Sequence, residues 1–109
     1  MAWLVHEGEV LASLEVASTA ADRRRGLLGR DGLDGALLLK PARMVHTVRM
    51  RFPIDVIFCD ADLCVLDIVT MVPNRLGLPR WRAGAVIEAP SGAAARWNLS
   101  TGEQLDVKE

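Results

Sequence analysis

The stretch Pro53–Val72, PIDVIFCDADLCVLDIVTMV, decides the fold of this chain of 109 residues. It contains two apolar runs, Ile54–Cys59 and Cys64–Val72, on either side of the acidic turn Asp60–Leu63. Short runs rich in valine and isoleucine that are bounded by a turn are typical of β-strands, and proline suits the first position of a strand. We therefore predict a β-hairpin. Because both runs are apolar on both faces, we expect this hairpin to lie centrally in its sheet.

The rest of the chain predicts further short strands and two short helices. Ser18 or Thr19 can cap a helix that carries Asp22 in its first turn and ends before Gly29. The further strands that we expect are Trp3–His6, Val10–Val16, Ala36–Lys40, Ala85–Ala89 and Gln104–Val107, and the helices are Ala20–Leu28 and Ala93–Trp97. The prediction is a mostly β fold (α+β by strict count). We expect a compact antiparallel barrel or sandwich of about seven short strands with one or two short helices.

The composition is that of one globular domain, residues 1–109. A chain of 109 residues has no room for a second domain with its own core, and its composition, half hydrophobic and a quarter charged, is ordinary for a globular protein. The formal net charge of −1 predicts no membrane or nucleic-acid partner. No apolar run approaches the ~20 residues of a membrane span, and Glu7 comes too early for a signal peptide. We expect a soluble, cytoplasmic protein that is a monomer or a homodimer.

The two cysteines are expected to be reduced, because a cytoplasmic compartment keeps thiols free. Cys59 and Cys64 bracket the acidic turn without the spacing of a redox motif, and two thiols alone do not make a zinc site. Asp60 and Asp62 resemble the start of a calcium loop, but the glycine and the last glutamate of such a loop are missing. We therefore expect no metal and no cofactor.

Polar side chains crowd the segment Met44–Arg49, which we expect to be extended and which leads into the central hairpin. A second polar stretch is the long loop Pro73–Ala83, where Trp81 lies between two arginines. Arginine and tryptophan are the residues that most often dominate binding energy. Our hypothesis is one ligand-binding face made by Arg25, His46, Thr47, Arg49, Met50, Trp81 and Glu88. For Trp81 the alternative is that its ring covers one end of the barrel.

Three motifs, taken in order, resemble the bacterial and archaeal family known as domain of unknown function 192, whose biochemical role is not settled. The motifs are Arg25–Arg30 (RGLLGR), His46–Phe58 (HTVRMRFPIDVIF) and Val86–Gly92 (VIEAPSG), the last followed by Trp97–Glu103 (WNLSTGE). The resemblance spans about Leu14 to Val107 and implies a small β-rich fold. Two positions depart from the family pattern: Leu63 takes the place of a turn glycine, and Glu103 takes the place of an aspartate.

Two classes of function are consistent with these residues. We favour a non-enzymatic module that binds an unidentified small molecule or protein. The alternative is a small hydrolase or transferase in which Asp55 or Glu88 orients His46 as a general base. No nucleophile motif completes that set, and both acids can instead pair with Arg49, Arg51 or backbone amides to hold the strand ends.

Nucleic-acid binding through an arginine-rich face is the third and least favoured function. Eight basic residues lie between Asp22 and Arg51, and planar guanidinium groups suit phosphates. The total charge does not support this function, and the abundance of arginine also has a simple alternative cause in genome composition.

Overall fold

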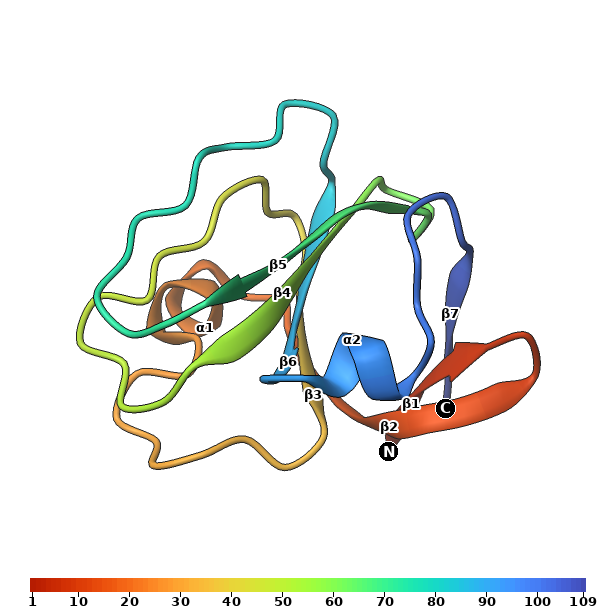
Figure 1. Ribbon diagram of the computed structural model, residues 1–109, viewed down its shortest axis with the longest axis horizontal. Helices are drawn as coiled ribbons and strands as arrows, with labels where there is room; N and C mark the ends of the chain where they lie inside the picture. Colours follow the sequence, from red (N-terminus) through yellow and green to blue (C-terminus); the bar gives the residue numbers. More distant parts are fainter.

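The computed structural model describes all residues from 1 to 109 and contains seven strands and two short helices. The strands are β1 (Ala2–His6), β2 (Glu9–Ala17), β3 (Ala36–Leu39), β4 (Ile54–Cys59), β5 (Val65–Met71), β6 (Ala85–Pro90) and β7 (Leu105–Lys108). The helices are α1 (Ala20–Arg25) and α2 (Ala93–Arg96). All strands belong to one curled sheet in the order β5-β4-β6-β3-β2-β1-β7 (Figure 1). The prediction of a mostly β, barrel-like fold is confirmed.

The sheet is antiparallel at every strand pair except one. β2 and β3 run parallel, with Leu14 opposite Ala36. Parallel neighbours need a crossover connection, and here the crossover contains α1 and the loop after it. The sheet is therefore mixed rather than wholly antiparallel.

The two outer strands of the sheet approach each other, so that the sheet nearly closes into a barrel. The amide of Val65 donates to the carbonyl of Glu103 at 2.9 Å, and the amide of Leu105 donates to the carbonyl of Leu63 at 3.0 Å. The predicted hairpin of β4 and β5 is present, with Ile54 opposite Met71. Its expected central position holds for β4 alone, since β5 is the outermost strand of the hydrogen-bonded order.

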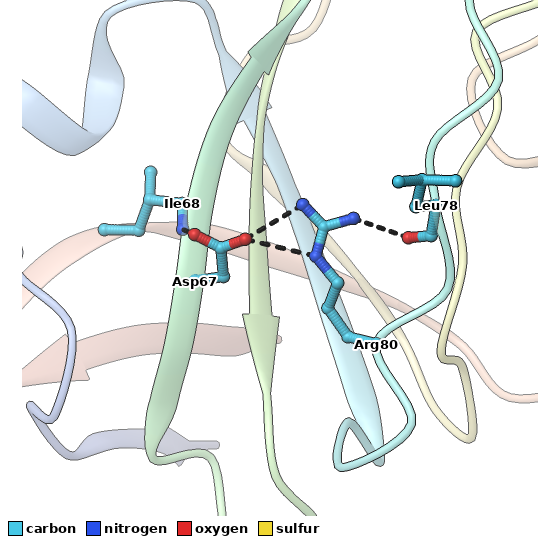
Figure 2. A network of polar contacts seen from close by, with 4 residues as sticks. All are labelled: Asp67, Ile68, Leu78 and Arg80. Atoms are coloured by element: carbon cyan, nitrogen blue, oxygen red, sulfur yellow. Dashed lines mark hydrogen bonds and ion pairs between the residues drawn. The ribbon is translucent and has the colours of Figure 1, made fainter.

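A polar network explains how the apolar strand β5 can lie at the edge of the sheet (Figure 2). One oxygen of Asp67 accepts from the amide of Ile68, and the other accepts from Nε and Nη2 of Arg80, at 3.1 and 2.9 Å. The guanidinium of Arg80 lies 4.4 Å from the ring centre of Phe58 and also donates to the carbonyl of Leu78. A charged side chain on an outer strand disfavours pairing with another chain.

The turn between β4 and β5 contains Leu63 and is flanked by the two cysteines. Leu63 takes the left-handed conformation that a glycine would favour, with φ 69°. Cys59 is opposite Val65 because the register shifts beside it, so the two cysteines are not direct cross-strand partners. Both thiols are free, as predicted.

The sheet separates two hydrophobic cores. Ile54, Val56 and Phe58 of β4 face the core on the side of α1, whereas Ile57 and Cys59 face the core on the side of α2. In Figure 1, α2 lies inside the curve of the sheet and α1 lies among the loops beyond β4 and β6. No helix of the protein has both the length and the apolar character that a bilayer span requires.

Candidate functional site

Glu88 is a carboxylate at a core position of the sheet. It lies on β6 between Leu37 of β3 and Val56 of β4, which are its direct cross-strand neighbours. Both neighbours belong to the core on the side of α1, and paired residues of adjacent strands point to the same face. The residue is only 4% exposed. A leucine or valine would be expected in such surroundings.

The carboxylate of Glu88 has no partner within the protein. It takes part in none of the hydrogen bonds or ion pairs of the chain, and its oxygens are not sealed off from the adjoining cavity. Burial raises the pKa of Glu88 to about 7, and the more distant guanidinium of Arg30 offsets this effect in part. Burial without a bonding partner disfavours the ionised form of an acid, which is the physical cause of the shift.

The end of α1 shapes the space above Glu88. Thr19 caps the start of the helix, where its hydroxyl accepts from the amide of Asp22 at 3.0 Å. The helix was predicted to continue to Leu28 but ends at Arg25. Gly26 ends it with φ 48° and ψ −122°, a conformation that side chains with a Cβ atom rarely adopt. The turn at Gly26 brings the backbone over the Glu88 carboxylate and sends Leu27 into the core.

A cavity of about 70 Å³ lies beside Glu88, and we call it the Glu88 cavity. Its walls are mostly apolar, its mouth is basic, and Glu88 is its only acid. Its lining residues are Arg23, Arg24, Arg25, Gly26, Leu27, Leu28, Leu39, Met44, Val45, His46, Met50 and Glu88.

Some of the basic side chains at the mouth already contact other groups of the protein, and others do not. Arg23 donates to the carbonyl of Ser18 at 2.6 Å. Arg25 is 73% exposed at its side chain and lies 3.6 Å from Asp22, whereas Arg24 is exposed and has no ion pair. His46 is also exposed. The mouth therefore offers positive charge to a ligand at modest cost, because such weak surface pairs exchange easily with solvent.

Four of the seven residues of the predicted binding face lie together in this cavity: Arg25, His46, Met50 and Glu88. Thr47, Arg49 and Trp81 do not line it. Trp81 is 76% exposed in the loop before β6. Arg49 is exposed at a turn with φ 64°, where its amide donates to Oδ1 of Asn74.

Thr47 has a structural role and does not face a ligand. Its side chain is fully buried, and its hydroxyl donates to the carbonyl of Val72 at 2.6 Å and accepts from the amide of Arg75 at 2.9 Å. Its backbone carbonyl accepts from the amide of Asn74 at 2.7 Å. These bonds join the segment before β4 to the loop after β5, so its placement on an open binding face has to be corrected.

Asp55 has a structural role on the opposite face of the sheet from Glu88. One oxygen accepts from the hydroxyl of Thr70 at 2.8 Å, and the other accepts from the amide of Ala94 at 3.0 Å. Gly92, the N-cap of α2, has no side chain to cap the helix, so Asp55 supplies this bond from β4. His46 makes no ion pair or hydrogen bond with Asp55 or Glu88.

Sequence reasoning missed three contributors to the cavity: Arg24, Gly26 and the apolar wall around Leu27. The motif RGLLGR contained a signal for them, since a glycine directly after a basic helix end marks a sharp turn. The turn lies over β6, which is far away in the sequence, and a local motif cannot predict such a contact.

A metal ion could be held elsewhere, where His6, Glu7 and Glu103 place their ligating atoms within 4.8 Å of one another. His6 Nε2 lies 2.6 Å from Oε2 of Glu103, and the other oxygen of Glu103 accepts from the amide of Ser100. The close contact of His6 in β1 with Glu103 in the loop before β7 accounts for this arrangement.

Comparison with known proteins identifies relatives over nearly the whole chain. The model of the family DUF192, described as "Uncharacterized ACR", matches residues 2–107. UPF0127 protein PH1112 of Pyrococcus horikoshii is 32% identical over 91 residues, which cover 79% of this chain and 76% of the relative. UPF0127 protein PYRAB11210 of Pyrococcus abyssi is 29% identical over 105 residues, covering 92% and 86% of the two chains.

Two crystal structures share the fold. A protein of unknown function from Novosphingobium aromaticivorans superposes with a TM-score of 0.81 at 26% identity, over 96% of this chain and 82% of that one. A protein from Sinorhizobium meliloti, described provisionally as a transcription regulator, also gives a TM-score of 0.81, at 22% identity over 97% and 91% of the chains. The second likeness shows the fold alone.

Proposed function

The chain belongs to the uncharacterised family domain of unknown function 192, and from its own geometry we propose that it is a non-enzymatic module that binds a small molecule in the Glu88 cavity. The residues assigned to the ligand are Arg25, His46, Met50 and Glu88, joined by Arg24 at the mouth. Arg49 and Trp81 lie outside the cavity and are left out of the proposed site.

One observation carries this proposal: Glu88 is buried and has no partner. A carboxylate that serves only the fold is normally hydrogen-bonded or paired, as Asp55 is. Burying an unpaired carboxyl between Leu37 and Val56 costs stability, and a hydrophobic residue would avoid that cost. Perturbed acids in a cavity are typical of functional sites, where stability is given up for binding.

The contacts of His46 favour binding over catalysis. A general base needs an orienting partner and a nucleophile or water that it can activate. His46 contacts no carboxylate, and no serine, threonine, cysteine or lysine lines the cavity. A hydrolase or transferase using His46 with Glu88 is supported only by the cavity that these two residues share.

Ion pairs within the basic region argue against nucleic-acid binding. Two arginines of the basic region are paired with acids: Arg30 lies 2.9 Å from Glu15 and Arg51 lies 2.6 Å from Asp31. Such pairing reduces the positive charge that a phosphate backbone would meet.

Equilibrium dialysis of the purified protein against a small-molecule cell extract, followed by mass spectrometry, tests the proposal. We expect at least one compound to be enriched with the wild type and with the exposed-residue control Glu9→Gln, and to be lost with Glu88→Gln. No enrichment, or the same compounds enriched by Glu88→Gln, would overturn the proposal.

A further inference from the structure

The two ends of the Glu88 cavity have opposite chemistry. The buried end presents the oxygens of Glu88, which accept hydrogen bonds from no group of the protein. The exposed end presents the side chains of Arg24, Arg25 and His46. A ligand that satisfies both ends must carry a hydrogen-bond donor at one end and an anion at the other.

The size of the cavity restricts the ligand further. A cavity of about 70 Å³ is small, so it suits a small polar group rather than an extended ligand. The donor and the anion must therefore lie close together in the ligand. Leu27, Val45 and Met50 offer apolar contact for a short side chain beside them.

We infer that the ligand is a small amphoteric molecule of the amino-acid class, which places its ammonium group against Glu88 and its carboxylate at the arginines of α1. This inference rests on the proposed function. An ammonium group has three donors and a full positive charge, so it can occupy the open oxygens of one carboxylate and neutralise it. A guanidinium fork at the mouth matches the two oxygens of the ligand carboxylate.

A purely anionic ligand is the main competitor, and pH separates it from an amino acid. An anion alone would bind best when Glu88 is protonated, at low pH. An amino acid needs Glu88 ionised, so its affinity should rise with pH until Glu88 is fully charged. Besides Glu88, the charged or titratable groups around the cavity are Arg23, Arg24, Arg25, Arg30 and His46. Because a histidine also lines the mouth of the cavity, the comparison is repeated with His46→Ala.

Titration calorimetry and ¹⁵N NMR with L-alanine, propionate and ethylamine test the inference. Propionate is L-alanine without the amine, and ethylamine is L-alanine without the carboxylate. We expect L-alanine to bind the wild type at least tenfold more tightly than either probe. Glu88→Gln should weaken this binding at least tenfold, and the double variant Arg24→Gln, Arg25→Gln should weaken it several-fold. The control Glu9→Gln should leave it unchanged.

The outcomes separate this inference from the function on which it rests. If propionate or ethylamine binds at Glu88 as tightly as L-alanine, the cavity is a ligand site but the amphoteric ligand is wrong. If the affinity for L-alanine falls as pH rises, in the wild type and in His46→Ala, the amphoteric ligand is again wrong. If no probe binds, the inference is overturned, and the dialysis experiment decides the fate of the proposed function.

Discussion

The backbone of Gly26 lies over the carboxylate of Glu88: a Cβ atom at position 26 would be 3.6 Å from Oε1 of Glu88. This relationship joins the end of α1 to the sheet, and it brings the backbone close to the carboxylate without a hydrogen bond to it. The geometry of the cavity therefore depends on a glycine that the chain needs in order to make its turn.

Gly26→Ala should lower the free energy of unfolding and impair ligand binding. Holding a Cβ residue at φ 48° and ψ −122° costs roughly 1–3 kcal/mol, and a relaxed turn would move away from Glu88. Gly29→Ala is the matched control, because Gly29 also has a positive φ, of 82°, but no atom lies within 4 Å of an added Cβ. Urea denaturation should show a cost for both variants, with the loss of L-alanine binding confined to Gly26→Ala. Unchanged binding by Gly26→Ala would contradict this account of the turn.

Glu88→Gln should change how stability depends on pH. The pKa of Glu88 is raised from 4.5 to about 7 by burial, so the folded protein holds this proton more tightly than the unfolded chain. The unfolded chain ionises first, and the wild type therefore loses stability between these two pKa values as pH rises, by roughly 3 kcal/mol in all. Urea denaturation should show that the free energy of unfolding of Glu88→Gln, relative to that of the wild type, rises between about pH 5 and about pH 8 by up to this amount. If the difference in stability between Glu88→Gln and the wild type does not change with pH, the raised pKa of Glu88 is contradicted.

Thr47→Val should destabilise the protein far more than His46→Ala, although the two residues are adjacent. The valine variant removes the bond to the Val72 carbonyl and leaves the amide of Arg75 without its acceptor, a cost of about 1–3 kcal/mol. Because His46 is exposed, His46→Ala should lower the free energy of unfolding by less than about 0.5 kcal/mol. Thermal and urea unfolding of both variants measure this. If His46→Ala costs more than ~2 kcal/mol, His46 is a structural residue and leaves the proposed site.

Asp55→Ala should destabilise the protein by about 2–4 kcal/mol without a direct effect on the ligand, because it removes the acceptor of Ala94 and of Thr70. Asp106→Ala, at an exposed position of β7, is the control and should be near neutral. Unfolding experiments measure the stability, and titration with L-alanine measures the binding. An Asp55→Ala protein with full stability but no ligand binding would return Asp55 to the functional site.

The two cysteines should differ in their rate of alkylation. Burial raises the pKa of the Cys59 thiol to about 12, so little thiolate forms there, whereas Cys64 is only half-buried. Iodoacetamide should modify Cys64 in the native protein and both residues after unfolding without reductant. Peptide mass spectrometry locates the modified residue. Faster modification of Cys59 in the native state, or no free thiol after unfolding, would contradict the structure.

Most of the fold could be predicted from local patterns. The strand β4 has the predicted bounds, Ile54–Cys59, because proline marks its start and an acidic turn marks its end. The parallel pairing of β2 with β3 could not be predicted, since it depends on the path of the chain through α1. The edge position of β5 was missed for a related reason. Its apolar run is covered by Arg80 and by the nearly closed curl of the sheet, and neither feature is visible in a short window of sequence.

The candidate site could be predicted in part. Polar residues near a strand end pointed to His46 and Glu88, and the structure places both at one cavity. The same reasoning misassigned Thr47, whose partners are backbone groups at Val72 and Arg75. Every residue carries such backbone groups, so their position leaves no trace in the sequence. The isolation of Glu88 was equally hidden, because it depends on where the neighbouring arginines find other partners.

A direct NMR titration of the Glu88 side chain tests the central claim, that the chain buries a carboxylate without a partner and reserves it for a ligand. The ¹³C resonances of the glutamate carboxyl groups are followed with pH, and the resonance absent from Glu88→Gln identifies Glu88. We predict a midpoint at about pH 7 in the free protein and a lower midpoint with saturating L-alanine. A midpoint at or below the ordinary value of 4.5 in the free protein would show that Glu88 is already paired, and would contradict the account.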